Sequence, residues 1–107
     1  MITQPYKQLV LDGSLEVSPA TFMENANAVQ LTVVATEAVG SADVYVQQSN
    51  DAENWTLFGA RTEVASPGFY VLPAQVGICT RYVRVACEPT NVDGIVMLAV
   101  TQHTMKL

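Results

Sequence analysis

The 107-residue chain has few histidines and cysteines, side chains that often carry acid–base and nucleophilic catalysis, with one histidine and two cysteines. Any Ser-His-Asp or Cys-His arrangement would have to use His103, which lies near the end of the chain. No phosphate-binding loop, GxGxxG motif or GxSxG-like segment is present. We therefore expect no enzyme, no catalytic residue and no cofactor, and we expect His103 to be a solvated residue of the C-terminal tail.

Positive charge is scarce as well. Five basic residues stand against ten acidic ones, which gives a formal net charge of -5. Proteins that bind DNA or RNA carry clusters of Lys and Arg that displace counterions from the phosphates. Here the basic residues are scattered along the sequence, at Lys7, Arg61, Arg81, Arg84 and Lys106. We expect neither a nucleic-acid partner nor binding to an anionic membrane surface.

Long hydrophobic runs are missing. No stretch approaches the roughly 20 apolar residues that a membrane-spanning helix requires. Residues 1–7 lack the basic stretch and apolar run of a signal peptide. We expect a protein that is made in the cytoplasm and does not bind a membrane.

The two cysteines, Cys79 and Cys87, are too far apart in an extended chain to bond to each other. If residues 81–88 form one strand, the rise of about 3.3 Å per residue separates them by more than ~20 Å. A disulfide requires Cα atoms within about 7 Å. We expect two reduced thiols, with Cys87 as a small core residue, and no metal site, since no CxxC motif or nearby histidine accompanies them.

What the sequence does contain is alternation of apolar and polar residues, interrupted by Gly, Pro, Asn and Asp. Hydrophobic residues make up 50% of the chain, enough for one core in a single domain, residues 1–107. The turn signals recur at the 8–12-residue spacing of sandwiches, which predicts an all-β antiparallel β-sandwich, jelly-roll or Ig-like. We interpret segment 19–28 as a loop with at most one helical turn. About eight strands are expected, at residues 6–11, 14–18, 28–36, 42–48, 55–62, 68–76, 81–88 and 94–102.

The stretch 94–102 is apolar on both faces. Ile95, Met97 and Ala99 form one face, and Val96, Leu98 and Val100 form the other. A strand with two apolar faces is covered on both sides. A two-layer sandwich covers only one of them, so we expect either the Met97 set or the Leu98 set to contact another chain or to lie under the 19–28 loop.

The most distinctive segment is 48–55, with the sequence QSNDAENW. Asn and Asp side chains bond to nearby backbone groups, so Asn50 or Asp51 is expected to cap a tight turn before Trp55 opens the next strand. A glycan is an alternative ligand here, with Trp55 stacking on a sugar ring and Asn50, Asp51 and Asn54 bonding its hydroxyls. Calcium bound by Asp51 and Glu53 is a third alternative, although the ligand spacing of an EF-hand is lacking.

Arg84 lies between two valines of an expected strand. It is either an outward residue whose stem covers apolar surface, or a partner in an ion pair with Asp43 or Asp51, or an inter-subunit contact. The sequence leaves these alternatives open.

The run 44–55 (VYVQQSNDAENW), followed by 81–85 (RYVRV), resembles small β-sandwich proteins encoded among the structural genes of tailed bacteriophages and prophages. In that family a Ser-Asn-Asp-Gly-x-Asn-Trp-like turn follows one strand, and a Tyr-(Val/Ile)-Arg-(Val/Leu) strand returns across the sheet. The resemblance covers roughly residues 42–88. Ala52 replaces the usual Gly, so a left-handed backbone is not expected at that position.

The resemblance implies a virion component, such as a capsid decoration or accessory protein, that contacts its own copies or other capsid and virion proteins. It implies no catalytic residue and a location in the virion. The resulting candidate interaction residues are Asn50, Asp51, Asn54, Trp55, Arg84, Met97 and Leu98. The alternative function is a carbohydrate-binding or adhesion module that uses the Trp55 turn.

Overall fold

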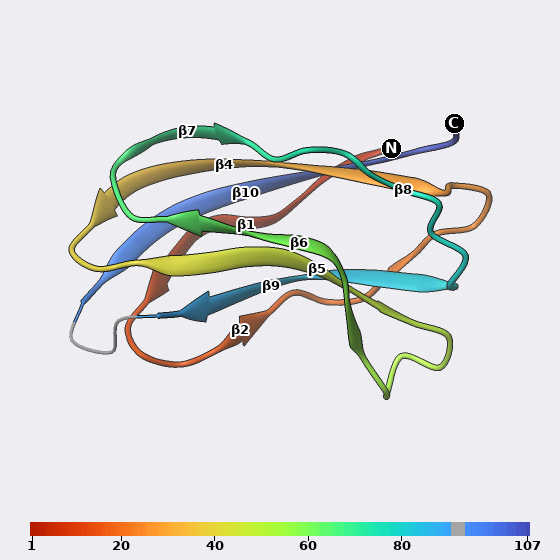
Figure 1. Cartoon of the computed structure of the whole chain (residues 1–107), viewed down its shortest axis with the longest axis horizontal. Helices are drawn as coiled ribbons and strands as arrows, with labels where there is room; N and C mark the ends of the chain where they lie inside the picture. The colour runs from red at the N-terminus through yellow and green to blue at the C-terminus, as the bar shows by residue number, and fades with distance from the viewer. Residues whose placement is uncertain (91–93) are drawn as a thin grey trace.

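The computed structural model describes residues 1–90 and 94–107, and all the regular elements within them are β-strands. They form two antiparallel sheets of five strands each, packed face to face (Figure 1), so the predicted all-β sandwich is confirmed. Nothing in these two stretches forms a helix long and apolar enough to cross a membrane. The strands are β1 (Ile2–Leu11), β2 (Glu16–Val17), β3 (Thr21–Phe22), β4 (Ala28–Ala38), β5 (Ala42–Ser49), β6 (Thr56–Val64), β7 (Gly68–Val71), β8 (Gln75–Val76), β9 (Tyr82–Pro89) and β10 (Val96–Met105).

The order of the strands is that of a jelly roll. Sheet A runs β1-β10-β4-β7 with β8 also paired to β4, and sheet B runs β2-β9-β5-β6 with β3 also paired to β9. Because β2 and β3 share one position and β7 and β8 share another, the ten strands occupy eight positions. Numbered along the chain, these positions run 1-8-3-6 in sheet A and 2-7-4-5 in sheet B, which is the order of two Greek keys in a jelly roll. Of the two predicted architectures, the jelly roll is correct and the Ig-like one is wrong.

Several observed strands differ from the expected ones, and β1 and β10 have other bounds, Ile2–Leu11 and Val96–Met105. The expected strand 68–76 is divided into β7 and β8, which are separated by a segment containing Pro73, a residue with no N–H to donate to a ladder. The 19–28 segment has no helical turn, but it contains the short strand β3, which pairs with Tyr82 and Val83 of β9. His103 is exposed, as predicted, but it lies within β10 and not in a tail.

The core lies between the sheets and is built by the period of two along each strand. Its largest members are side chains with 0–1% exposure, and each contributes about 1.5–3 kcal/mol by burial. Met23, from the loop between β3 and β4, is 3% exposed and belongs to the same core cluster. From the two sheets the core receives Leu31, Val33, Leu98 and Val100 on one side, and Val44, Val83, Val85 and Cys87 on the other.

The two apolar faces of β10 have different environments. Leu98 is 1% exposed and faces the core, so the prediction that it is a candidate interaction residue is wrong. Met97 pairs with Val10 of β1 and points away from sheet B, on the outer side of sheet A. The 19–28 loop does not lie on that outer side, since its Thr21 accepts a hydrogen bond from the core-facing Gln102 at 3.0 Å. Of the two expected coverings for the Met97 set, the loop is therefore excluded.

The two cysteines are both free, as predicted, with Cys79 exposed and Cys87 buried. Burial raises the pKa of the Cys87 thiol to about 12, so this group stays protonated at pH 8. We expect iodoacetamide at pH 8 to modify one thiol per native chain and two per chain in denaturant, as counted by intact mass. Cys79→Ser should reduce native labelling to none, whereas rapid modification of both native thiols would contradict the burial of Cys87.

Candidate functional site

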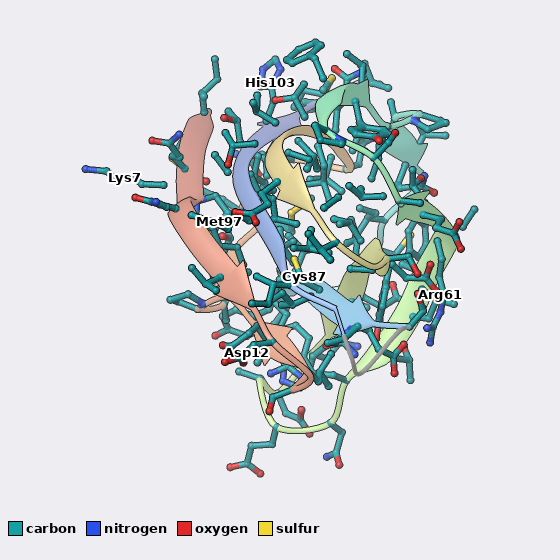
Figure 2. All side chains as sticks on the ribbon, turned by 90° about the vertical axis from the view of Figure 1, so that its left-hand side faces the viewer. Lys7, Asp12, Arg61, Cys87, Met97 and His103 are labelled. Atoms are coloured by element: carbon teal, nitrogen blue, oxygen red, sulfur yellow. The ribbon has the colours of Figure 1, made fainter. Side chains whose placement is uncertain are left out.

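The sandwich presents two outer faces, one on each sheet. Lys7 and His103 project from the side of sheet A, Arg61 projects from the opposite side, and Cys87 lies between the layers (Figure 2). The candidate interaction residues are divided accordingly. Met97 belongs to the outer side of sheet A, and Asn50, Asp51, Asn54, Trp55 and Arg84 belong to sheet B and the turn that extends from it.

The outer side of sheet A is apolar across four adjacent strands. Val34 of β4 pairs with Ala99 of β10 on one side and with Phe69 of β7 on the other, and residues paired in this way share one face. Phe69 is 67% exposed and Val71 is 56% exposed. We call this surface the outer apolar face, and its residues are Val10, Val34, Phe69, Val71, Met97 and Ala99.

The turn between β5 and β6 is organised by two side chains. The hydroxyl of Ser49 accepts the backbone N–H groups of Asp51 and Ala52, at 3.2 and 2.9 Å, and donates to Asp51 Oδ1 at 2.8 Å. The same carboxylate accepts the backbone N–H groups of Glu53 and Asn54, both at 2.9 Å. These bonds, first those from Asn54 and Glu53, hold the pKa of Asp51 well below its usual range. The expected capping of this turn by Asp51 is confirmed.

Ala52 has a left-handed backbone with φ of 61°, so the expectation for this position was wrong. The conformation costs an L-residue about 1–2 kcal/mol. The hydrogen bond from the Ala52 N–H to Ser49, together with the Asp51 bonds on both sides of it, holds the backbone in this conformation.

The same bonds bear on the calcium alternative. Oδ2 of Asp51 accepts from the Asn54 side chain at 2.8 Å, so both oxygens of this carboxylate already have donors. Residues 1–90 and 94–107 contain no group of three or more His, Cys, Asp or Glu side chains placed to hold a metal ion. Calcium binding at this turn therefore has no structural support.

Trp55 comes directly before β6 and is stacked against Arg84. The guanidinium carbon of Arg84 lies 4.2 Å from the ring centroid of Trp55, and its Nε–H donates to Gln47 Oε1 at 2.7 Å. Because Arg84 covers one face of the indole, a sugar ring could stack only on the other face. Glycan binding at this turn stays a prediction. Among the described residues Arg84 has no ion pair, so of its alternatives the pairing with Asp43 or Asp51 is wrong. The reason is register, because Arg84 is paired with Gln47, whereas Asp43 is paired with Glu88.

A second arginine, missed in the sequence, forms the ion pair. Arg61 lies over the ring of Tyr45 at 4.3 Å from its centroid, and it bonds to Glu88 and lies 3.6 Å from Asp43. The bond to Glu88 raises the pKa of Arg61, while burial lowers the pKa of Arg84. The two arginines on this face are therefore in different electrostatic environments.

Aromatic and apolar side chains surround Arg84. Tyr82 lies two residues before it on the same face of β9, and its ring centroid is 5.6 Å from that of Phe22. Phe22 is 56% exposed and Leu57, which pairs with Gln47, is 44% exposed. We call this surface the Arg84 patch, and its residues are Phe22, Gln47, Trp55, Leu57, Tyr82 and Arg84.

Both termini lie at the same end of the sandwich (Figure 1). A hollow of about 350 Å³ lies beside them. It is lined by residues 22–26, Met1 and residues 104–106. The N-terminal ammonium group donates to the carbonyl of Thr104 at 2.8 Å, which fixes the two termini side by side. Glu24 and Lys106 are the ionisable side chains in the lining, and no histidine or cysteine is among them.

Comparison of the chain with known proteins finds a similar fold in a solved structure. No family model and no curated protein matches the chain. The crystal structure of the PBSX exported protein XepA matches it with a TM-score of 0.80 and 14% sequence identity. The match covers 100% of this chain and 37% of that chain, so the present chain spans little more than a third of that protein's length. At this identity the match establishes the fold alone, which is a β-sandwich shared with part of that protein.

Proposed function

We propose that the chain is a structural assembly protein of a phage particle, such as a capsid decoration or accessory protein, which acts through contacts with its own copies. The observation that carries this proposal is the outer apolar face of sheet A, where four adjacent strands present apolar side chains to solvent. The resemblance of segments 44–55 and 81–85 to phage structural proteins, and the fold shared with a PBSX protein, support the phage setting.

The size of the outer apolar face suits a self-contact. Its side chains leave on the order of 400 Å² of apolar surface exposed, and the largest patches on monomers of ~300–600 Å² are often functional. Two copies placed face to face would bury about twice that area, which approaches the roughly 1,000 Å² of a specific interface. At about 25 cal/mol per Å² this burial is comparable with the ~4–15 kcal/mol cost of association.

The charge distribution also favours a second copy as the occupant. The strands of sheet A carry only two charged side chains, Lys7 and Glu37, which are of opposite sign. The chain as a whole has a net charge of -5, so copies repel one another through their other surfaces. Sheet A is the neutral surface through which two copies can approach.

Light scattering after size exclusion, at low and high protein concentration, tests the proposal. We expect a mass above that of the 11.6 kDa monomer at high concentration. Phe69→Lys should lower that mass to the monomer value, because it places a charge within the buried face in place of its most exposed aromatic side chain. Leu15→Lys is the matched control, since Leu15 is 51% exposed and lies outside both sheets. A monomer at every concentration, or equal effects of the two substitutions, would overturn the proposed interface.

A further inference from the structure

The outer side of sheet B carries two arginine–aromatic stacks that differ in one component. Arg61 lies over Tyr45 and Arg84 lies over Trp55, at nearly equal distances of 4.3 and 4.2 Å from the ring centroids. The guanidinium of Arg61 also forms ion pairs with the carboxylates of Glu88 and Asp43. At Arg84 the corresponding acceptor is the neutral amide of Gln47, and no carboxylate in the described part of the chain lies within ion-pair distance.

Among residues 1–90 and 94–107, Arg84 is therefore a half-buried cation without an anion, in a chain whose net charge is -5. The ring of Trp55 and the oxygen of Gln47 offset only part of the cost of removing a guanidinium from water. A guanidinium has five N–H donors, and the bond to Gln47 uses the one on Nε. The donors on its two terminal nitrogens match a planar acceptor with two oxygens, which is the geometry of a carboxylate.

The surroundings of Arg84 indicate what the carboxylate is attached to. Trp, Tyr and Arg are the residues most enriched at the energetic centres of protein interfaces. Here Trp55, Tyr82 and Arg84 lie together, with the exposed side chains of Phe22 and Leu57 beside them. Such a patch suits a ligand that carries an apolar side chain next to a carboxylate. A protein segment with an acidic residue beside an apolar residue is a ligand of this kind.

We propose that the Arg84 patch docks an acidic segment of a neighbouring particle subunit, with an Asp or Glu carboxylate on the terminal nitrogens of Arg84 and an adjacent apolar side chain against Trp55 and Leu57. The identity of the partner as a particle subunit rests on the proposed function. The recognition of a carboxylate beside an apolar side chain rests only on the patch, and the isolated chain displays it. The site is on the opposite side of the sandwich from the outer apolar face, so the two contacts are separable.

The probe is the capped dipeptide N-acetyl-Glu-Leu-amide, compared with N-acetyl-Gln-Leu-amide, which has the same shape and no charge. Trp55 is the only tryptophan, so its fluorescence reports on this site alone. We expect a saturable change with the Glu peptide, with a dissociation constant on the order of 1 mM, and binding of the Gln peptide about tenfold weaker or less. Broadening of the peptide's proton NMR signals gives a second readout that does not depend on the tryptophan.

Three variants locate the binding. Arg84→Gln should abolish it, and Arg84→Lys should weaken it severalfold because an ammonium lacks the planar pair of donors. Arg81→Gln, which removes the same charge from an exposed residue outside the patch, should leave it unchanged. Persistence of binding in Arg84→Gln, equal binding of the two peptides, or no binding of the Glu peptide would each overturn the proposal.

Two further arms separate this site from its alternatives and from the proposed function. Inorganic phosphate that competes as well as the Glu peptide would assign Arg84 to anions in general and overturn docking of a protein segment. The titration is repeated with Phe69→Lys, which should bind the Glu peptide as the parent chain does. If the parent chain forms oligomers but does not bind the Glu peptide, only the docking site at Arg84 is overturned. If the parent chain is a monomer at every concentration but binds the Glu peptide, only the proposed interface on sheet A is overturned.

Discussion

Leu98→Asp is expected to unfold the chain, and Met97→Asp, one residue earlier on the same strand, is expected to leave it folded. Leu98 is 1% exposed and belongs to the core cluster between the two sheets. A carboxylate at this position has no partner, and burying an unpaired charge costs more than about 4–5 kcal/mol. That is a large share of the ~5–15 kcal/mol by which a domain is stable. Circular dichroism during heating and in urea measures the loss.

Met97→Asp is the matched control for this prediction because it makes a similar change on the other face of β10. Met97 pairs with Val10 and Glu37 on the outer side of sheet A, where water reaches a carboxylate. We expect a folded protein with reduced self-association, since the new charge lies in the outer apolar face. A Leu98→Asp protein that melts near the parent temperature would mean that β10 is shifted by one residue, which exchanges its two faces.

The strands that carry a clean alternation were predictable from sequence, and the polar core positions were not. Leu31 and Val33 of β4 are buried on one face, as the pattern of residues 28–36 indicates. On β10 the core face continues through Gln102, which is 1% exposed. Its buried amide donates to Thr21, a residue of the two-residue strand β3. A strand of this length has no period to detect, so neither β3 nor the partner of Gln102 was predicted.

The local part of the candidate site was also predictable, while its long-range part was not. Asp51 caps a turn whose donors and acceptors lie within five residues, and composition alone indicates such a turn. The partner of Arg84 depends on how β5 and β9 are aligned. Asp43 is four residues from Gln47 along β5, or about 13 Å in an extended strand, which is beyond ion-pair distance.

The stack of Arg61 on Tyr45 depends on a register shift between β5 and β6 that has no recognisable signal in the sequence. Between β5 and β6 the register shifts where one residue, Tyr45, faces three residues of β6 that include Gly59 and Arg61. Gly59 has φ of 80°, a conformation that favours glycine. A shift of this kind changes which side chain lies over Tyr45, so face assignments from alternation fail beyond it.

Gly94 is held against the turn between β4 and β5 more closely than any side chain allows. A Cβ at this position would lie 1.9 Å from the carbonyl oxygen of Val39 and 2.6 Å from Cα of Gly40. Both are backbone atoms, so no side chain can rotate away to make room. The N–H of Val39 donates to the carbonyl of Ile95 at 2.8 Å, which ties the two segments together beside the contact.

Gly94→Ala is therefore expected to destabilise the chain by about 3 kcal/mol or more, because the two backbones must separate to admit one methyl group. The melting temperature should fall by roughly 15 °C or more, as measured by circular dichroism. Gly77→Ala is the control, since Gly77 has φ of 78° but nothing within 4 Å of the added Cβ. That variant carries only backbone strain, worth about 1–2 kcal/mol. The steric clash is present only in Gly94→Ala. Equal losses of stability in the two variants would therefore show that the close approach of Gly94 to Val39 does not hold in solution.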